Sequence, residues 1–344
     1  MNKKIIRKAH KGKVIFALLC AVVLAVAYNT FYGDAVREQN TIYINSDTDY
    51  NTVRSTVFAS VRSSIKQKAF DIYAKRINLQ KRIKAGYYKI EKGQSVIRIA
   101  RVLALGEQSP VNLVINEART LPQLAGKIAS QIECDSVTLL KAMQNRKLRA
   151  SVGYVKDSLI ALFLPNTYQV WWSIKPEQLL QRMKRESDTF WNSKRKEKAR
   201  KAGFTPYQVM ILASIVYEET KDKGEMRKIA GVYVNRLRKG MPLQACPTVK
   251  YAMGRFDLKR VMHKHLKYRS PFNTYINKGL PPAPICIPSL SAIEAVLNYE
   301  KSDYLFFCAK PEFDGKHNFA RTLKEHNKNA DAYAKALDKL NKSN

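Results

Sequence analysis

The chain has 344 residues, of which 45% are hydrophobic, and a formal net charge of +33 at pH 7. This length and apolar content allow a sizeable core and two folded lobes, and they exclude a disordered or fibrous protein. The charge favours a polyanionic partner, a class that includes nucleic acid, an anionic membrane surface and a cell-wall polymer bearing peptide carboxylates. Charge alone does not choose among them, and a solvated basic surface is the simplest interpretation.

An uncharged apolar run at residues 14–32 follows a basic tail at residues 1–13. Its length of about 19 residues is close to what a helix needs to cross a bilayer core. Because basic flanks stay in the cytoplasm, we expect a single-pass anchor in the cytoplasmic (inner) membrane, with Gly33 onward extracytoplasmic or periplasmic. A cleaved signal peptide is the alternative, since Ala25-Val26-Ala27 resembles a processing site. Export in this way argues against nucleic acid as a partner.

The segment from residue 33 to residue 110 alternates short strands and helices. Alternating apolar residues predict strands at Thr41–Ile44 and Tyr87–Ile90. Helical periodicity predicts helices near Thr52–Ser64, Lys66–Arg82 and Ser95–Leu105. These elements predict a small α+β domain.

The region from residue 111 to residue 344 begins with a predicted strand and helix at 111–129. Pro165 and Asn166 then predict a turn. Glu177–Arg200 is predicted as one basic helical stretch, with a solvated face and with inward-facing apolar residues at Leu179, Leu180, Met183 and Phe190.

The helix that starts after Thr205 is the most informative element of the sequence. Thr205, Pro206 and Gln208 form the pattern of a capping box, which marks a helix start. From Val209 to Val216 only Ser214 is polar, so this helix is expected to lie in a core.

Glu218 and Glu219 stand at the end of this apolar helix. An ionised carboxylate is costly to bury, and an apolar setting raises a Glu pKa above about 4.3, which suits a general acid. The alternative is that both glutamates are simply the first exposed residues after a buried helix. Spacing does not separate them, because the helical rows that lead to Glu218 and to Glu219 are both apolar.

Four successive segments resemble the motifs of the endolytic murein transglycosylases, the MltG or YceG-like family. They are ILASIVYEET, VYVNRLRKGMPLQACPTVKYAMG, SPFNTYINKGLPPAPICIP and HNFARTLKEHN, and they span about 120 residues in the family order. The family helix usually reads ASI(V/I)ExE(T/A), with the catalytic glutamate as its second acid. That acid falls on Glu219, whereas Tyr217 replaces the first acid and Glu218 takes the variable position. The resemblance therefore implies Glu219 as the catalytic residue.

The same resemblance implies substrate-binding residues around a cleft, namely Asn235, Gln244, Asn273 and Tyr275. Arg236, next to Asn235, has the alternative role of satisfying carbonyls in the last turn of its helix. Departures from the family pattern occur nearby, at Ala283, Cys286 and Ser289, and also at Asn166, where the family has Asp.

AGYYKIEKGQSVIRIARVLALG resembles the LysM-like domain of the family, while residues 41–82 agree with it only in outline. A LysM-like domain implies contact with glycan, and a spacer that positions the catalytic domain is the alternative. The expected fold is α+β, with a transmembrane helix at 14–32, a small LysM-like α+β domain at 33–110 and a mixed α/β catalytic domain of the YceG-like type at 111–344.

A single well-supported acid selects the chemistry. Most glycosidases use two carboxylates about 5 to 10 Å apart. Glu218 and Glu219 are adjacent and point about 100° apart on a helix, so they are not expected to form such a pair. A lytic transglycosylase needs only one acid, and the resemblance implies cleavage of the MurNAc–GlcNAc bond within nascent peptidoglycan strands, with 1,6-anhydro-MurNAc ends as product and elongation terminated. It also implies peptidoglycan synthases of the elongation machinery as partners.

The histidines and the cysteines show no compact metal-ligand spacing, so neither a metal nor a cofactor is predicted. The pairing of Cys134, Cys246, Cys286 and Cys308 is left open, and buried free thiols are the simplest interpretation. Two other functional classes also remain, a binding module without catalysis and a basic nucleic-acid binder.

Overall fold

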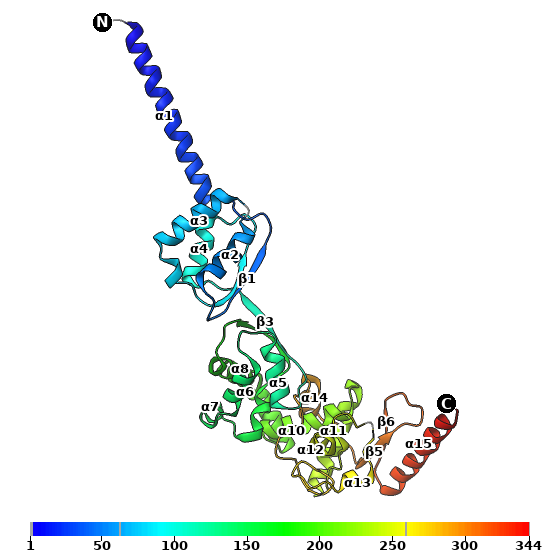
Figure 1. The fold of residues 1–344 in the computed structure, drawn as a ribbon. Coiled ribbons are helices and arrows are strands. Elements are labelled where there is room, and N and C mark those ends of the chain that lie inside the picture. Colours follow the sequence, from blue (N-terminus) through cyan, green and yellow to red (C-terminus); the bar gives the residue numbers. More distant parts are fainter. Residues whose placement is uncertain (1–2, 62, 259, 344) are drawn as a thin grey trace. The chain divides into compact units, whose positions relative to one another are not determined.

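A computed structural model describes residues 3–61, 63–258 and 260–343 of the chain (Figure 1). Residues 1 and 2 of the predicted tail, and residue 62 near the end of a predicted helix, lie outside this description. The chain divides into two compact units. The first comprises Met1–Asn112 and Gln169–Ile174, and the second comprises Leu113–Tyr168 and Lys175–Asn344. The mixed helix and sheet content agrees with the predicted α+β class, and the predicted boundary between residues 110 and 111 stays a prediction.

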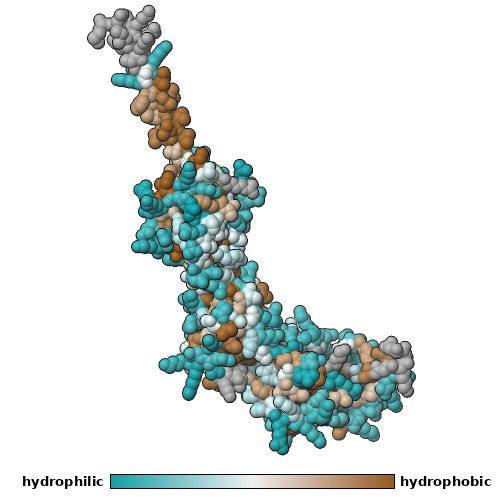
Figure 2. Space-filling model, in the orientation of Figure 1, coloured by the Kyte–Doolittle hydropathy of each residue, from teal (hydrophilic) through white to brown (hydrophobic). Residues whose placement is uncertain are grey.

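The N-terminal element is a helix, α1 (Lys3–Tyr32), that contains the predicted apolar run. Its segment His10–Tyr32 is long and apolar enough to cross a membrane. Figure 2 shows this apolar stretch, where large side chains such as Phe16 and Leu24 are about 70% exposed. Exposure of so much apolar surface to water is unfavourable, so the helix suits a bilayer. A signal sequence has the same properties.

In the first unit, β1 (Asn40–Ile44) pairs antiparallel with β2 (Gly86–Ile90). One face of this two-stranded sheet buries Ile42, Ile44, Tyr88 and Ile90 against the helices, as expected of alternating strands with one buried face. The helices of the unit are α2 (Tyr50–Ser60), α3 (Ser64–Arg76), the short 3₁₀ helix η1 (Leu79–Lys81) and α4 (Val96–Leu105).

Two predicted helices were wrong in their extent. The predicted Lys66–Arg82 helix ends at Arg76, because Asn78 takes a left-handed conformation with φ of 53°. The predicted Glu177–Arg200 stretch is two helices, α8 (Pro176–Phe190) and α9 (Ser193–Ala202). The Asn192 side chain between them accepts a hydrogen bond from Arg195 N and so begins a new helix.

The strands β3 (Pro110–Ile115) and β4 (Asn166–Trp171) pair in a two-stranded sheet. Between them in the sequence lie α5 (Leu121–Ala129), α6 (Ser136–Gln144), α7 (Arg146–Ser151) and the 3₁₀ helix η2 (Lys156–Leu162).

The core of the second unit surrounds α10 (Pro206–Glu219), which packs against α11 (Lys223–Arg238), α12 (Cys246–Met253) and α14 (Leu290–Leu297). The remaining elements are α13 (His263–Leu266), the antiparallel pair β5 (Phe306–Ala309) and β6 (His317–Ala320), and α15 (Leu323–Ser343). The α10 helix is therefore surrounded by elements that follow it in the sequence, from α11 directly after it to the more distant α14.

Candidate active site

The α10 helix begins and is buried as its sequence predicts. Thr205 Oγ1 accepts a hydrogen bond from Gln208 N at 3.2 Å, and Gln208 Oε1 accepts one from Thr205 N at 2.8 Å. Every residue from Val209 to Val216 is buried. The one polar side chain in that run, Ser214, donates to Ile211 O and accepts from Ile285 N, so its hydroxyl is satisfied.

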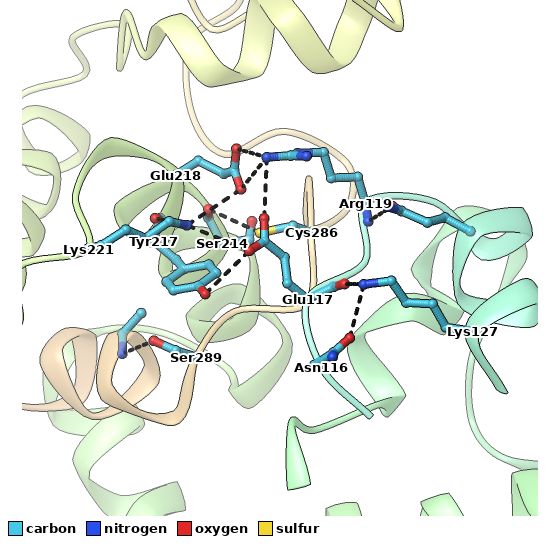
Figure 3. A network of polar contacts seen from close by, with 12 residues as sticks. Asn116, Glu117, Arg119, Lys127, Ser214, Tyr217, Glu218, Lys221, Cys286 and Ser289 are labelled. Atoms are coloured by element: carbon cyan, nitrogen blue, oxygen red, sulfur yellow. Dashed lines mark hydrogen bonds and ion pairs between the residues drawn. The ribbon is translucent and has the colours of Figure 1, made fainter. Parts of the chain in front are cut away.

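Glu218 belongs to a charged network on one side of the helix end (Figure 3). Arg119 Nη2 donates to both Glu218 carboxylate oxygens, at 3.2 and 3.0 Å, and lies 3.3 Å from Glu117. Lys221 Nζ lies 3.8 Å from Glu218, and the Tyr217 hydroxyl lies 3.4 Å from Glu117. Arg119 and Lys221 thus both pair with Glu218, and these contacts hold its side chain within the charged network.

Glu219, the last residue of α10, meets different surroundings. Its Oε1 accepts a hydrogen bond of 2.8 Å from the Tyr233 hydroxyl on α11. Loss of water around the carboxyl raises the pKa of Glu219 to about 7, an effect that the charge of Glu218 reinforces and that Tyr233 and Lys250 oppose. Near neutral pH the protonated and ionised forms are therefore both populated, as general acid–base catalysis requires.

A cavity of about 420 Å³ opens at Glu219. It is lined by side chains from α10, α11, α12, β5, β6, α15 and the intervening loops, among them Glu219, Tyr233, Arg236, Leu243, Gln244, Cys246, Tyr275, Phe306, Phe307, Cys308, His317 and His326. Among the described residues that line it, Glu219 is the only carboxylic acid. The mixture of aromatic rings with amide, guanidinium and hydroxyl groups suits a sugar.

Two of the predicted substrate-binding residues, Gln244 and Tyr275, lie in this cavity. Gln244 has a left-handed backbone with φ of 55°, and Arg236 Nη2 donates to its side-chain oxygen. Tyr275 Oη is 3.1 Å from Cys246 Sγ. The left-handed backbone of Gln244 is strained because Gln244 is not a glycine, and such strain is concentrated at functional sites.

The other two predicted substrate-binding residues, Asn235 and Asn273, are not among the residues that line the cavity. The Asn235 amide donates to the carbonyls of Ser302 and Tyr304, just before β5. The Asn273 amide donates to the carbonyls of Leu266 and Tyr268 and its oxygen accepts from Tyr275 N, which fixes the loop carrying Tyr275. Both amides thus hold loops that border the site.

Arg236 is a buried residue that organises the same loops. Its Nε donates to Pro242 O and its Nη1 to Leu305 O, at 2.9 and 3.0 Å. These carbonyls lie outside its own helix, so the expected alternative of capping the last turn does not describe its contacts. Desolvation lowers the pKa of Arg236 from its ordinary value, which a buried guanidinium tolerates when it is well hydrogen-bonded.

Tyr233 is a site residue to which the sequence assigned no role. A buried tyrosine usually has a hydrogen-bond partner for its hydroxyl, and this tendency is the feature from which a role for Tyr233 could have been predicted. Its pKa is raised well above 10 by burial and by the nearby Glu219, so Tyr233 stays a donor.

A larger cavity of about 720 Å³ lies at the other end of α10, beside Thr205, Pro206 and Tyr207. Its only carboxylate among the described lining residues is Asp188, and that group is paired with Lys184 at 2.5 Å. This cavity therefore offers no proton donor comparable with Glu219.

Comparison with known proteins agrees with the motifs. Residues 31–332 match the family described as YceG-like. The chain belongs to the YceG-like family. This confirms the family resemblance and shows that it extends well beyond the four motifs, across both units.

Proteins of Bacillus subtilis and Streptococcus pneumoniae are similar to this YceG-like protein. A protein of Bacillus subtilis named endolytic murein transglycosylase is 31% identical over 286 residues, which are 78% of this chain and 77% of that protein. A protein of the same name in Streptococcus pneumoniae is 32% identical over 294 residues, 76% of this chain and 52% of that longer protein.

The fold has a solved counterpart. A crystal structure of a YceG-like protein of Listeria monocytogenes is similar with a TM-score of 0.58 and 30% sequence identity, covering 85% of this chain and 98% of that one. This similarity confirms the YceG-like fold expected for the catalytic region.

Proposed function

We propose that this YceG-like protein is a membrane-anchored endolytic lytic transglycosylase that cleaves the MurNAc–GlcNAc bond within peptidoglycan glycan strands. One observation carries the proposal: Glu219 is the only acid among the described residues lining its cavity, and its pKa is raised to about 7. The names of the Bacillus and Streptococcus relatives support murein as the substrate.

In the first step, protonated Glu219 donates its proton to the glycosidic oxygen while the C1–O bond of the muramoyl residue breaks. The GlcNAc end leaves with a free hydroxyl, and positive charge develops at C1. A carboxyl group whose pKa is near the working pH is the effective donor for this step.

In the second step, the Glu219 carboxylate accepts the proton of the muramoyl C6 hydroxyl, and O6 forms a bond to C1. The product carries a 1,6-anhydro ring, no water is consumed and Glu219 returns to its protonated state. Since the nucleophile belongs to the substrate, no second carboxylate is needed, and the nucleophile reacts within one molecule.

Tyr233 serves both steps by holding the carboxyl group. Its hydroxyl donates to Glu219 Oε1, so it limits rotation of the side chain and stabilises the carboxylate formed after the first step. Gln244 and Tyr275 are proposed to contact the sugars, and Asn235 and Asn273 to position the loops around them.

Anchoring by α1 in the cytoplasmic membrane, with the N-terminus in the cytoplasm, is part of the proposal. An anchored enzyme meets glycan strands where they emerge from the membrane, which suits cleavage within nascent strands and termination of their elongation. Synthases of the elongation machinery are the expected partners.

The first unit carries an aromatic face that supports glycan contact over a simple spacer role. Tyr43 and Tyr87 are paired on the outer face of the β1–β2 sheet, with ring centroids 4.8 Å apart, and Trp172 lies 5.2 Å from Tyr43. Tyr43 is 55% exposed, and Tyr87 and Trp172 are partly exposed. Aromatic rings on the solvent face of a sheet are suited to stacking on pyranose rings.

The test is mass spectrometry of products after the full chain, in detergent micelles, is incubated with uncrosslinked glycan strands. Glu219→Gln and Glu218→Gln are compared with the wild type. Anhydro-muramoyl ends from the wild type and Glu218→Gln, and none from Glu219→Gln, are expected. Reducing ends would identify a hydrolase, and intact strands that still bind would identify a binding module.

A further inference from the structure

Lys250 lies close to both glutamates of the site. It is one helical turn after Cys246 on α12, so the two side chains share a face of that helix. Cys246 lines the cavity of Glu219, whereas Lys250 lines a neighbouring pocket of about 60 Å³ together with Arg119 and Glu218. The charge of Lys250 also acts on the Glu219 carboxyl group. Lys250 thus lines a pocket with Glu218 and acts electrostatically on Glu219.

No carboxylate in the described part of the chain lies within 4.0 Å of the Lys250 ammonium group, although its charge acts on Glu219 from farther away. The other cations of the cluster differ in this respect, since Arg119 and Lys221 both pair with Glu218. Lys250 is also only partly exposed. A half-buried ammonium group beside a catalytic acid has lost part of its hydration, and an anionic ligand restores favourable contacts.

The walls of this pocket suit an anion carried on an organic arm. Tyr251, Phe256 and Pro247 line it beside Lys250, and the Arg119 guanidinium lies 5.2 Å from the centre of the Phe256 ring. The apolar walls exclude water from one side and strengthen any ion pair that forms there. A carboxylate on a short flexible arm matches this combination.

We propose that Lys250 binds a carboxylate that the muramoyl residue carries on its lactyl arm or its stem peptide, beside the bond that Glu219 protonates. This inference rests on the proposed function. The lactyl arm belongs to the same pyranose ring as the scissile C1–O bond. One helical turn, about 5.4 Å, separates Lys250 from the cavity-lining Cys246, which is the scale of one sugar ring.

An alternative role for Lys250 is to change the pKa of Glu219 without contacting the substrate, and this role would have a different kinetic effect. The charged and titratable groups that act on Glu219 are Tyr233 from α11, Glu218 from α10 and Lys250 from α12. Removal of Lys250 raises the pKa of Glu219 and moves the pH profile of kcat upward for every substrate. A contact with a substrate carboxylate instead raises KM, and only for substrates that bear that carboxylate.

The experiment compares Lys250→Gln and Lys250→Arg with the wild type as full chains in detergent micelles. Lys194→Gln, an exposed lysine on α9, is the matched control. The substrates are peptide-bearing uncrosslinked strands, the same strands with their carboxylates amidated, and strands denuded of peptides, which expose the lactyl carboxylate. We expect KM to rise about tenfold for Lys250→Gln on peptide-bearing strands, with Lys250→Arg and Lys194→Gln near wild type.

Amidated strands are expected to show equal KM for the wild type and Lys250→Gln. A KM difference on peptide-bearing strands assigns a carboxylate of the stem peptide, because the lactyl carboxyl is bound there in an amide. A KM difference that occurs only on denuded strands assigns the lactyl carboxylate. Equal KM on all unamidated strands, or a change in the pH profile of kcat alone, would overturn the inference and leave the transglycosylase intact. Absence of cleavage by the wild type would instead refute the proposed function.

Discussion

The two sides of the α10 helix end place identical side chains in opposite environments. Glu218 faces a network in which Arg119 and Lys221 compensate its charge, whereas Glu219 faces a cavity in which a tyrosine hydroxyl is its hydrogen-bond partner. Glu218 is held in ion pairs, whereas loss of water favours the protonated form of Glu219. Adjacent residues thus acquire distinct chemistry from the elements packed against them.

The largest effect is expected from Glu219→Gln. The amide keeps the size of the side chain and can still accept from Tyr233, but it has no proton to donate. Loss of a general acid typically lowers the rate about 10²- to 10⁴-fold, and we expect a loss in kcat of about 10³-fold. Release of anhydro-muramoyl products measures it. Glu218→Gln is the matched control. An equal loss of kcat in the two variants would show that Glu218 and Glu219 do not differ in their catalytic role.

The stability of the protein should depend on pH through Glu219. Its folded pKa of about 7 lies above its ordinary 4.5, so its contribution to stability is complete below about pH 4.5. That contribution is lost as pH rises toward and through 7, by about 2–3 kcal/mol relative to Glu219→Gln. Urea unfolding of both proteins at pH 5 and pH 8 measures this. An unchanged difference between the two pH values would show that Glu219 is fully solvated.

Arg119→Ala should weaken the charged network around Glu218. Among the described residues, the more distant Lys221 is then the only cation that pairs with both Glu218 and Glu117, so the end of α10 is less firmly held. We expect a loss of about 1–2 kcal/mol in the free energy of unfolding and a severalfold fall in kcat. Urea unfolding and product release measure the two effects. Arg119→Lys should recover part of both, and full activity with Arg119→Ala would show that the network does not position Glu219.

Tyr233→Phe should give the smallest effect, about fivefold in kcat. The lost hydrogen bond stabilised the carboxylate, so the pKa of Glu219 rises further and the alkaline limb of the kcat profile moves to higher pH. Tyr217→Phe removes a hydroxyl from the other side of the helix end and should leave that limb in place. A profile that shifts equally in both variants contradicts a specific role for Tyr233.

Local sequence signals determined several features of this protein. The capping box at Thr205 and the uninterrupted apolar residues after it specify a buried helix that ends at two acids, because these interactions form within a few residues of each other. The sequence also sufficed to predict the apolar helix α1 and, from the motifs, the family. Where a local signal was weak, as at Asn78 and Asn192, the predicted helices were wrong in extent.

Only the tertiary structure distinguished the two glutamates by their surroundings. Arg119 reaches Glu218 from 99 residues away, and Tyr233 reaches Glu219 from a different helix. Asn235 and Asn273 likewise hold loops whose positions the sequence does not specify, one of them with carbonyls 67 and 69 residues away. Helical periodicity encodes which face of a helix is apolar, but the identity of the side chains packed against that face is a property of the folded chain.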